Sequence, residues 1–336
     1  MTLPAAPGIR PAPRAGCGFA VPWKISAKEG VTMRAVQFRE YGGPEVLQVA
    51  DVAEPHPGPG QIRIAVRAAS VNPIDWKRRR GLFGGDAAEL PIIPGVDAAG
   101  VVDETGDGVD DVAPGDDVFG FTVGGACAEL ALLEHYAVKP AGMSWEEAAG
   151  LPVAVETAVR TLDALGVEDG HTLLINGAAG GVGAAAVQFA RARGARVIGT
   201  ASEANHDFLR SLGAEPTTYG AGLADRVREL APGGVDRALD VAGHGALQDL
   251  IAATGSPDRV ITIADFSAPE HGVRVSTGGD DRAWHALGEA ARLHEEGRFS
   301  LPVAQAFAFD QAPEAHRISE EGHVRGKLVL TPQAGS

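Results

Sequence analysis

A glycine-dense turn follows a short apolar run and precedes a stretch of small residues. Residues 173–175 (Leu-Leu-Ile) favour a strand, and residues 184–193 favour a helix. The turn between them contains Gly177, Gly180, Gly181 and Gly183. Glycine allows a tight turn and close approach to a ligand, while a helix N-terminus offers free N–H groups. The pattern therefore predicts a binding site for a dinucleotide pyrophosphate, and a side chain at Gly181 is expected to block it. A turn without a ligand is disfavoured because strand and helix are both in place.

The segments around this turn alternate between strand-like and helical stretches. Strands are expected at 173–175, 196–200, 237–241 and 259–264, and helices at 153–165, 184–193, 205–212, 223–230 and 245–253. Such alternation predicts a parallel sheet covered by helices on both faces. We therefore expect a doubly wound α/β domain of the Rossmann type at residues 154–276.

The first third of the chain has a different pattern, with short strands broken by Pro and Gly. Strands are expected at 34–38, 61–68, 98–104, 117–121 and 126–132, as in a β-rich barrel. A helix at 281–296 and strands at 303–309 and 327–330 are expected to return to this module, so that 277–332 complete it. Residues 1–32 are rich in Pro and Ala, and we expect a disordered leader that is not a secretory signal.

Composition limits the possible partners. The 336 residues are 45% hydrophobic, which suffices for two domains. A formal charge of −15 argues against nucleic acid or an anionic membrane as the main partner. No apolar run approaches the roughly 20 residues that span a bilayer. The two cysteines, Cys17 and Cys127, fit a reducing cytoplasm and provide neither a disulfide framework nor a cysteine-rich zinc site.

Several motifs appear in a characteristic order between Met33 and Pro332. They lie at 41–47 (Tyr-Gly-Gly-Pro-Glu-Val-Leu), 70–75 (Ser-Val-Asn-Pro-Ile-Asp), 94–100, 114–118, 177–183 and 326–330 (Gly-Lys-Leu-Val-Leu). Together they resemble the medium-chain dehydrogenase/reductase superfamily. The resemblance implies a GroES-like catalytic domain at 33–153 beside the Rossmann domain, which would bind NADP.

Zinc members of that superfamily hold their metal with a Cys, a His and an acidic residue. By resemblance, Asn72 stands at the Cys position here, and Gly95-Val96-Asp97 replaces Gly-His-Glu. An amide and a valine cannot supply a tetrahedral zinc site, and no histidine shows ligand spacing. The sequence therefore predicts a zinc-free reductase with no metal ligands.

The predicted lack of zinc determines the expected chemistry. Alcohol dehydrogenation relies on a Lewis acid, whereas a quinone or a conjugated enone can delocalise the charge that a hydride brings. The protein would mainly orient donor and acceptor and donate hydrogen bonds. We expect quinone or enone reduction. The alternatives are an enoyl-thioester reductase of a biosynthetic pathway and, from another class, a non-catalytic NADPH-binding structural relative.

The residues after the second strand of the α/β domain indicate the nucleotide. An NAD-preferring fold places an acid there, but Ala201 occupies that position, and Glu203 lies in the turn beyond it. NADPH is therefore favoured, with Ser202 and Asn205 hydrogen-bonded to its 2′-phosphate and Tyr219 near the adenosine. Relatives often have Lys at the position of Asn205. His206 or Arg210 could supply the missing charge, or be solvated helix residues.

The resemblance also places the remaining site residues. The cofactor is expected to contact Thr157, Val182, Val241, Ile263 and Lys327 as well as the glycine turn. Asn72, Tyr41 and Asp75 are the candidate catalytic residues. Tyr41 could donate a proton or simply pack beside the Gly-Gly-Pro turn.

Two further expectations concern the surroundings of the site. Relatives tend to have a small or amide residue at the position of Glu156, which is either a helix-surface residue or one that tunes the site. A homodimer is expected, with residues 259–264 and 272–276 as the edge strands that pair between subunits.

Overall fold

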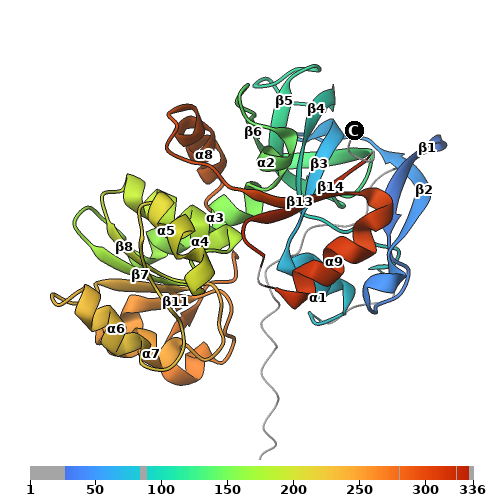
Figure 1. The fold of residues 1–336 in the computed structure, drawn as a ribbon. Coiled ribbons are helices and arrows are strands. Elements are labelled where there is room, and N and C mark those ends of the chain that lie inside the picture. The colour runs from blue at the N-terminus through green and yellow to red at the C-terminus, as the bar shows by residue number, and fades with distance from the viewer. Residues whose placement is uncertain (1–26, 84–88, 280, 323, 333–336) are drawn as a thin grey trace, which may run out of the picture.

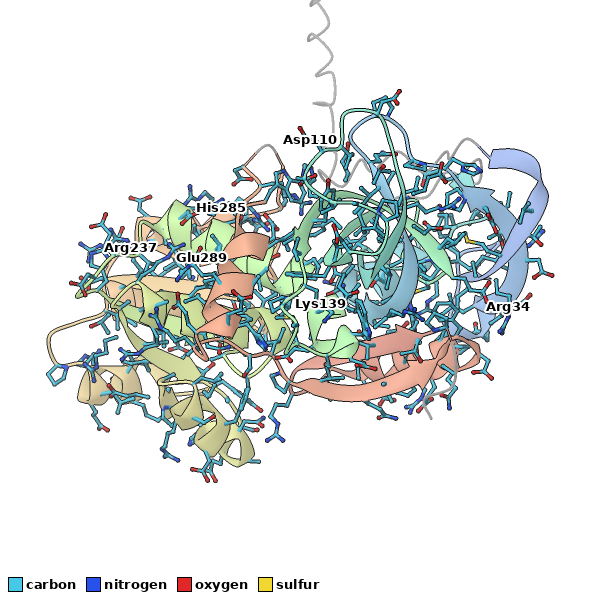
Figure 2. The ribbon with its side chains drawn as sticks, turned by 90° about the horizontal axis from the view of Figure 1, so that it is seen from above. Arg34, Asp110, Lys139, Arg237, His285 and Glu289 are labelled. Atoms are coloured by element: carbon cyan, nitrogen blue, oxygen red, sulfur yellow. The ribbon has the colours of Figure 1, made fainter. Side chains whose placement is uncertain are left out.

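The computed structural model describes residues 27–83, 89–279, 281–322 and 324–332. Two lobes lie side by side, one built on a parallel sheet and the other on a β-barrel (Figure 1). Seen from above, Arg237 lies in the first lobe and Arg34 in the second, with Lys139 between them (Figure 2). None of the helices in the described part of the chain is long and apolar enough to cross a bilayer.

The α/β lobe contains six parallel strands in the order β12-β11-β10-β7-β8-β9. They are β7 (Thr172–Asn176), β8 (Arg196–Thr200), β9 (Glu215–Thr217), β10 (Arg237–Asp240), β11 (Val260–Thr262) and β12 (Arg274–Val275). This confirms the doubly wound fold expected from the sequence. The strand order reverses between β7 and β10, and ligands of such sheets bind at that crevice, outside the carboxyl ends of the strands.

Helices cover both faces of this sheet. They are α3 (Pro152–Leu165), α4 (Gly181–Ala192), α5 (His206–Ser211), α6 (Leu223–Leu230) and α7 (Leu247–Thr254), with short 3-10 turns η3 (Glu203–Asn205), η4 (Pro257–Arg259) and η5 (Ala268–His271). Alternate residues of β7 face opposite sides, so that Leu173 and Ile175 join the core that includes α3 and α4, while Leu174 joins that of α6 and α7. The first of these cores continues into the barrel through Phe119 and Phe121, so the two lobes share apolar packing.

The other lobe is an antiparallel barrel extended by the C-terminal part of the chain. Its strands are β3 (Ile62–Val71), β4 (Asp97–Thr105), β5 (Asp117–Val123), β6 (Leu130–Val138), β13 (Val303–Ala308) and β14 (Lys327–Thr331). Pairing of β3 with β6 closes the barrel, and β14 pairs with β3. β1 (Ala27–Gln37) and β2 (Gln48–Pro55) form a separate two-stranded sheet. The β-rich barrel expected from the sequence is therefore present, and the C-terminal strands β13 and β14 return to it.

Further helices lie against the barrel lobe or beside the α/β lobe. They are η1 (Pro44–Val46), α1 (Pro73–Arg79), α2 (Trp145–Ala149), α8 (Ala286–Glu295), η6 (Phe309–Gln311) and α9 (Ala312–Glu321). In Figure 1, α8 lies above the α/β lobe and α9 lies against the barrel lobe near α1.

Several element boundaries differ from the sequence expectations. β1 begins at Ala27, inside the segment expected to be a leader, because it pairs with β2; residues 1–26 lie outside the described residues. The expected helix at 281–296 begins only at Ala286, since Arg282 and Trp284 make contacts with other elements. β2, α1 and α9 were not predicted.

The edge strands also differ from the expectation. β11 pairs with β10 on one side and with β12 on the other, so it is an interior strand. Of the two segments expected to pair between subunits, only β12 lies at an edge of the sheet, and it is two residues long.

Candidate active site

The glycine turn leaves an open space in front of α4. Gly180 is the N-cap of this helix, and no side chain caps it, so the first N–H groups of the helix are available to a ligand. A Cβ at Gly180 would meet nothing closer than the Gly177 oxygen at 3.7 Å. A Cβ at Gly183 would lie 2.3 Å from that oxygen, so Gly183 serves close packing instead. The turn fits a pyrophosphate on the side of Gly180.

Gly181 faces the C-terminal strand rather than this space. A Cβ built at Gly181 would lie 3.0 Å from Cδ of Lys327, which corrects the expectation that a side chain there would project toward the pyrophosphate. The backbone of Gly180 also forms a parallel bridge with that of Gly326. Lys327 therefore lies directly beside the glycine turn, although it comes from the other lobe.

A row of buried polar side chains joins the carboxyl ends of four neighbouring strands. These are Thr200 of β8, Asn176 of β7, Asp240 of β10 and Thr262 of β11, which we call the strand-end belt. Thr200 Oγ1 donates to Asn176 Oδ1 at 2.7 Å, and Asn176 Nδ2 donates to Asp240 Oδ1 at 2.8 Å. Thr262 Oγ1 donates to Asp240 Oδ2 at 2.8 Å. The belt was not predicted, although each of these strands ends in a polar residue after apolar ones.

The belt also holds the turns that follow the strands. Thr200 Oγ1 accepts a hydrogen bond from the backbone N–H of Gly177 at 3.0 Å. Asp240 Oδ1 accepts from the N–H groups of Gly243 at 2.8 Å and Ala242 at 3.1 Å. The shape of the edge where a dinucleotide would lie is thus fixed by side chains that are themselves buried.

The turn after β8 brings two of the predicted phosphate ligands together. Asn205 Nδ2 donates to Ser202 Oγ at 3.1 Å, and Ala201 before them is buried. Arg210 is paired with Asp207 at 2.6 Å on the exposed side of α5. The side chain of Tyr219 is 56% exposed, in the turn after the neighbouring strand β9.

A second buried polar group lies where β3, β4 and β14 meet near the glycine turn. It consists of Ser70, Asn72, Asp97 and Lys327, which we call the Asn72 cluster. Lys327 Nζ donates to Asn72 Oδ1 at 2.5 Å, and Asn72 Nδ2 donates to Asp97 Oδ2 at 2.9 Å and to Ser70 Oγ at 3.1 Å. Ser70 Oγ donates to the same Asp97 oxygen at 2.8 Å. The amide N–H groups of Asn72 are therefore both engaged within the cluster.

Asp75 lies next to this cluster and caps α1. Its Oδ2 accepts from the backbone N–H of Asn72 at 2.7 Å. Burial raises the pKa of Asp75 to about 7; the N–H of Asn72 opposes this rise, and the nearby Asp97 adds to it. Burial lowers the pKa of Lys327, while the neighbouring carboxylates oppose that change. The region therefore combines two buried acids with one buried ammonium group.

The donor set of the Asn72 cluster does not fit zinc. Asn72 Oδ1 is bound to the Lys327 ammonium, and Val96 has no donor atom. Both oxygens of Asp97 are engaged, since Oδ1 accepts from the Val153 N–H at 3.2 Å. Across the described ranges, no group of three or more His, Cys, Asp or Glu side chains is arranged to hold a metal ion. The ammonium group of Lys327 already provides a positive charge at this position.

The remaining predicted residues come from both lobes. Thr157 is buried on α3, while Val182, Val241 and Ile263 are half-buried at the carboxyl edge of the sheet. Tyr41 is half-buried in the barrel lobe, with its ring centroid 6.1 Å from that of Phe38.

Glu156 is fully buried, so it is not a helix-surface residue. It accepts a hydrogen bond from Arg160 Nε at 2.8 Å and one from Arg282 Nη1 at 3.4 Å. The sequence indicated that Glu156 was unusual, but it gave no sign of these partners.

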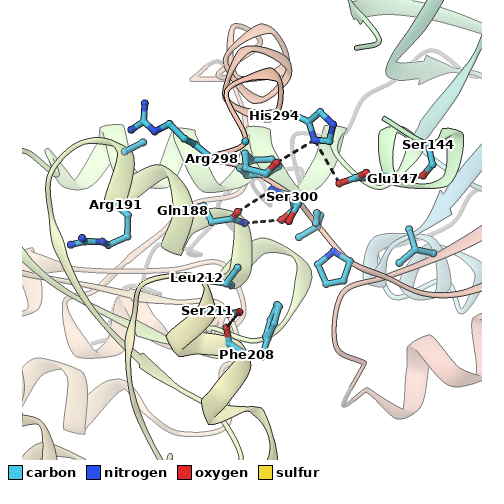
Figure 3. A pocket seen from close by; sticks show the side chains of 16 residues that line it. Ser144, Glu147, Gln188, Arg191, Phe208, Ser211, Leu212, His294, Arg298 and Ser300 are labelled. Atoms are coloured by element: carbon cyan, nitrogen blue, oxygen red, sulfur yellow. Dashed lines mark hydrogen bonds and ion pairs between the residues drawn. The ribbon is translucent and has the colours of Figure 1, made fainter. Parts of the chain in front are cut away.

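A cavity of about 900 Å³ lies away from all of these residues (Figure 3). It is lined by the C-terminal half of α4, by α5 and by residues 297–303. Gln188 and Ser300 exchange two hydrogen bonds across it, at 2.9 and 3.0 Å. None of the predicted site residues lines this cavity, which lies at the end of α4 opposite the glycine turn.

Comparisons with known families match the two lobes. Residues 58–161 match the alcohol dehydrogenase GroES-like domain, and residues 212–330 match the zinc-binding dehydrogenase family. Together, the barrel, the parallel sheet and the glycine turn define an oxidoreductase that binds a nicotinamide dinucleotide.

Individual relatives show which kinds of oxidoreductase the chain is similar to. The chain is 36% identical over 321 residues to a quinone oxidoreductase of Rattus norvegicus, covering 89% of this chain and 97% of the rat protein. It is 32% identical over 327 residues to a chloroplastic NADPH-dependent alkenal/one oxidoreductase of Arabidopsis thaliana, covering 89% and 80% of the two chains. The solved quinone oxidoreductase of Coxiella burnetii matches with a TM-score of 0.76 and 31% identity, over 90% of this chain and 100% of that one. The chain belongs to the medium-chain dehydrogenase/reductase superfamily, in its quinone oxidoreductase-like branch.

Proposed function

We propose that the protein is an NADPH-dependent reductase that transfers a hydride to a quinone or a conjugated enone without a metal ion. The observation that carries this proposal is the Asn72 cluster. At the positions where zinc relatives hold their metal, this chain has an amide, a valine and a fully engaged carboxylate around the Lys327 ammonium. A conjugated acceptor suits such a site because it stabilises the incoming charge itself.

The chain's own residues would bind and orient the reactants. The open side of Gly180 and the N-terminus of α4 would receive the pyrophosphate, and the methylene part of the Lys327 side chain would border this space beside Gly181. The nicotinamide supplies the hydride when it is bound. Thr157, Val182, Val241 and Ile263 would hold its ring at the carboxyl edge of the sheet.

The proton for the acceptor oxygen needs a donor other than Asn72. Both N–H groups of the Asn72 amide are already donated to Asp97 and Ser70. The Tyr41 hydroxyl, ordinarily protonated at neutral pH, is our candidate donor. Asp75 contributes by capping α1 and adjusting the charge of the cluster.

The preference for NADPH rests on the turn after β8. Ala201 is buried where an acid would bind the ribose 2′-hydroxyl, and Ser202 and Asn205 form a small polar pair next to it. Ala201→Asp should reverse the preference by charge repulsion and a new ribose hydrogen bond, an effect on the order of 1–3 kcal/mol. Fluorescence titration with NADPH and NADH would measure it. Equal affinities of the wild type for both would refute the assignment.

We further propose that the protein works in the cytoplasm as a homodimer. The free edge of β12 supports pairing with a second copy, because exposed edges invite strand addition. Light scattering at micromolar concentration tests the dimer, and a monomeric mass would contradict it.

The substrate class is tested by turnover. NADPH oxidation should be measured with a panel of quinones, enones and enoyl thioesters. Quinones or enones should give the highest kcat/KM. Preference for the thioesters would instead favour an enoyl reductase, and activity with none of the three would favour a non-catalytic nucleotide-binding relative.

A further inference from the structure

The buried carboxylate of Glu156 organises the end of α3 that faces the site. It accepts from Arg160 Nε at 2.8 Å and from the backbone N–H of Ala283 at 3.2 Å. The Arg160 side chain is itself 4% exposed, so this is a buried ion pair within one helix. Burying a carboxylate costs desolvation free energy, which is offset only where hydrogen-bond partners satisfy its oxygens. Here the carboxylate of Glu156 in turn holds Arg160 in one orientation.

Arg160 extends this arrangement to the end of strand β12. Its Nη1 donates a hydrogen bond to Ser276 Oγ. Ser276 directly follows β12, and its backbone N–H donates to the Thr262 carbonyl at 2.9 Å, which places it at the carboxyl edge beside the strand-end belt. Ser276 is 9% exposed.

The hydroxyl group of Ser276 has a hydrogen left to donate. A serine hydroxyl can donate once and accept twice, and the bond from Arg160 uses one acceptor position. Among the contacts of the described residues, no acceptor for this hydrogen is found. The hydroxyl group is thus fixed by a buried cation and keeps a free donor.

The order of the strands in the sheet indicates which part of a bound dinucleotide would lie near the Ser276 hydroxyl group. Ser202 and Asn205, which would bind the 2′-phosphate, follow β8, and the glycine turn follows β7. A dinucleotide lying across the strand ends from β8 past β7 must therefore extend its nicotinamide half over β10, β11 and β12. That half would then end near Ser276.

We propose that Ser276 donates its hydroxyl hydrogen to the carboxamide oxygen of the nicotinamide ring, with Arg160 and Glu156 as positioning residues. This inference rests on the proposed nicotinamide-dependent function. The hydrogen bond would fix the rotation of the carboxamide and, with it, the face of the ring that is presented to the acceptor.

The segment that carries Ser276 is anchored to both lobes. Arg282 Nε donates to the Gly278 carbonyl at 2.6 Å, and the Arg282 guanidinium lies 5.3 Å from the centroid of the Trp284 ring. Trp284 in turn stacks on His135 of β6, with ring centroids 3.8 Å apart. Ser276 thus comes from a segment that is held against the barrel, which suits a residue that positions the reacting ring.

The test compares NADPH with its thionicotinamide analogue, whose thioamide sulfur accepts hydrogen bonds weakly. Single-turnover hydride transfer to one quinone is measured with each cofactor in wild type and Ser276→Ala. With NADPH, Ser276→Ala should slow transfer by about tenfold. With the thio analogue the two proteins should differ by less than about twofold, because the hydrogen bond is already weakened.

Three further variants separate this role from general damage to the fold. Ser276→Thr keeps the hydroxyl and should restore the wild-type response to both cofactors. Glu156→Gln, if it folds, should reproduce the loss with NADPH and add little to Ser276→Ala. Ser256→Ala, which lies before the amino end of β11 and so away from the carboxyl ends of the strands, should change neither rate.

The outcomes distinguish this inference from the proposed function. An equal slowing of Ser276→Ala with both cofactors would overturn the carboxamide contact while leaving the reductase proposal intact. A wild type that transfers no hydride from NADPH to any quinone or enone would overturn the proposed function itself.

Discussion

The strand-end belt and the Asn72 cluster are both buried polar groups at the candidate site, but they differ in charge. The belt contains one carboxylate, Asp240, and four donors converge on it. The Asn72 cluster and its neighbour Asp75 contain two carboxyl groups and the single ammonium of Lys327. Hydrogen bonds compensate the single carboxylate of the belt, whereas the cluster and Asp75 together have more carboxyl groups than cations.

Because of this difference, we expect the belt and the cluster to have separate roles. A fully satisfied network makes its surroundings rigid, so the belt sets the shape of the sheet edge at which we propose that the dinucleotide binds. Buried charges that are incompletely compensated shift their pKa values, so the cluster would set the charge at the proposed reaction site. Damage to the belt should therefore appear as lost binding and stability, and damage to the cluster as altered pH dependence.

The largest expected effect comes from the turn that the belt supports. Gly180→Val should leave the fold intact, since the backbone there is extended and the space is open, but it should weaken NADPH binding by at least about 100-fold. Gly183→Val should instead destabilise the protein, because its Cβ would clash with the Gly177 carbonyl. Calorimetric titration and thermal unfolding measure the two effects. Normal NADPH affinity in Gly180→Val would place the dinucleotide elsewhere.

Breaking the belt itself should have an intermediate effect. Asp240→Asn keeps the size of the side chain but replaces one carboxylate oxygen by an NH2 group. The oxygen at the Oδ1 position can keep its three donors, and the new NH2 group then faces Thr262 Oγ1, which already accepts from the N–H groups of Ala264 and Asp265. We expect a loss of about 1–3 kcal/mol in the free energy of unfolding, together with weaker NADPH binding. Urea denaturation measures the first. An unchanged midpoint would mean that the belt does not hold the sheet edge.

The effect expected from the cluster depends on pH. The pKa of Asp75 is about 7 when folded, above its ordinary value of 3.8, so the folded state binds the proton more tightly. The stability contributed by Asp75 is therefore complete below about pH 4 and is lost as the pH rises through 7. The Asp75→Asn variant has no carboxyl group to titrate there. Its free energy of unfolding relative to that of the wild type should therefore rise by at most about 1.4 kcal/mol per pH unit in that range. Urea unfolding at pH 5 and pH 8 tests this, and a constant difference would contradict it.

Much of the fold could be predicted because its signals are local. The apolar β7 followed by glycines and a small-residue helix predicts one strand–turn–helix unit without reference to the rest of the chain. β2, α1 and α9 were missed because their residues are more polar and their burial depends on distant partners. The prediction that β11 lies at an edge of the sheet was also wrong, because strand order depends on contacts that no local pattern encodes.

For the candidate site, the sequence could not reveal the interactions among the predicted residues. The departures at Asn72 and Val96 already excluded the ligand set of zinc relatives. The bond between Lys327 and Asn72 joins residues 255 positions apart in the chain, so spacing could not reveal it. The same holds for Glu156 and Arg282, whereas the polar ends of the four belt strands were visible and went unused.

The central claim is that hydride transfer here needs no metal ion, because Lys327 and its partners fill the position of one. The most direct measurement is the single-turnover rate of NADPH oxidation by a quinone, before and after exhaustive dialysis against a strong chelator, with zinc content determined on the same samples. The account predicts the same rate in both samples and less than about 0.1 zinc per chain in either. A rate that falls on chelation and returns when one equivalent of zinc is added would contradict it.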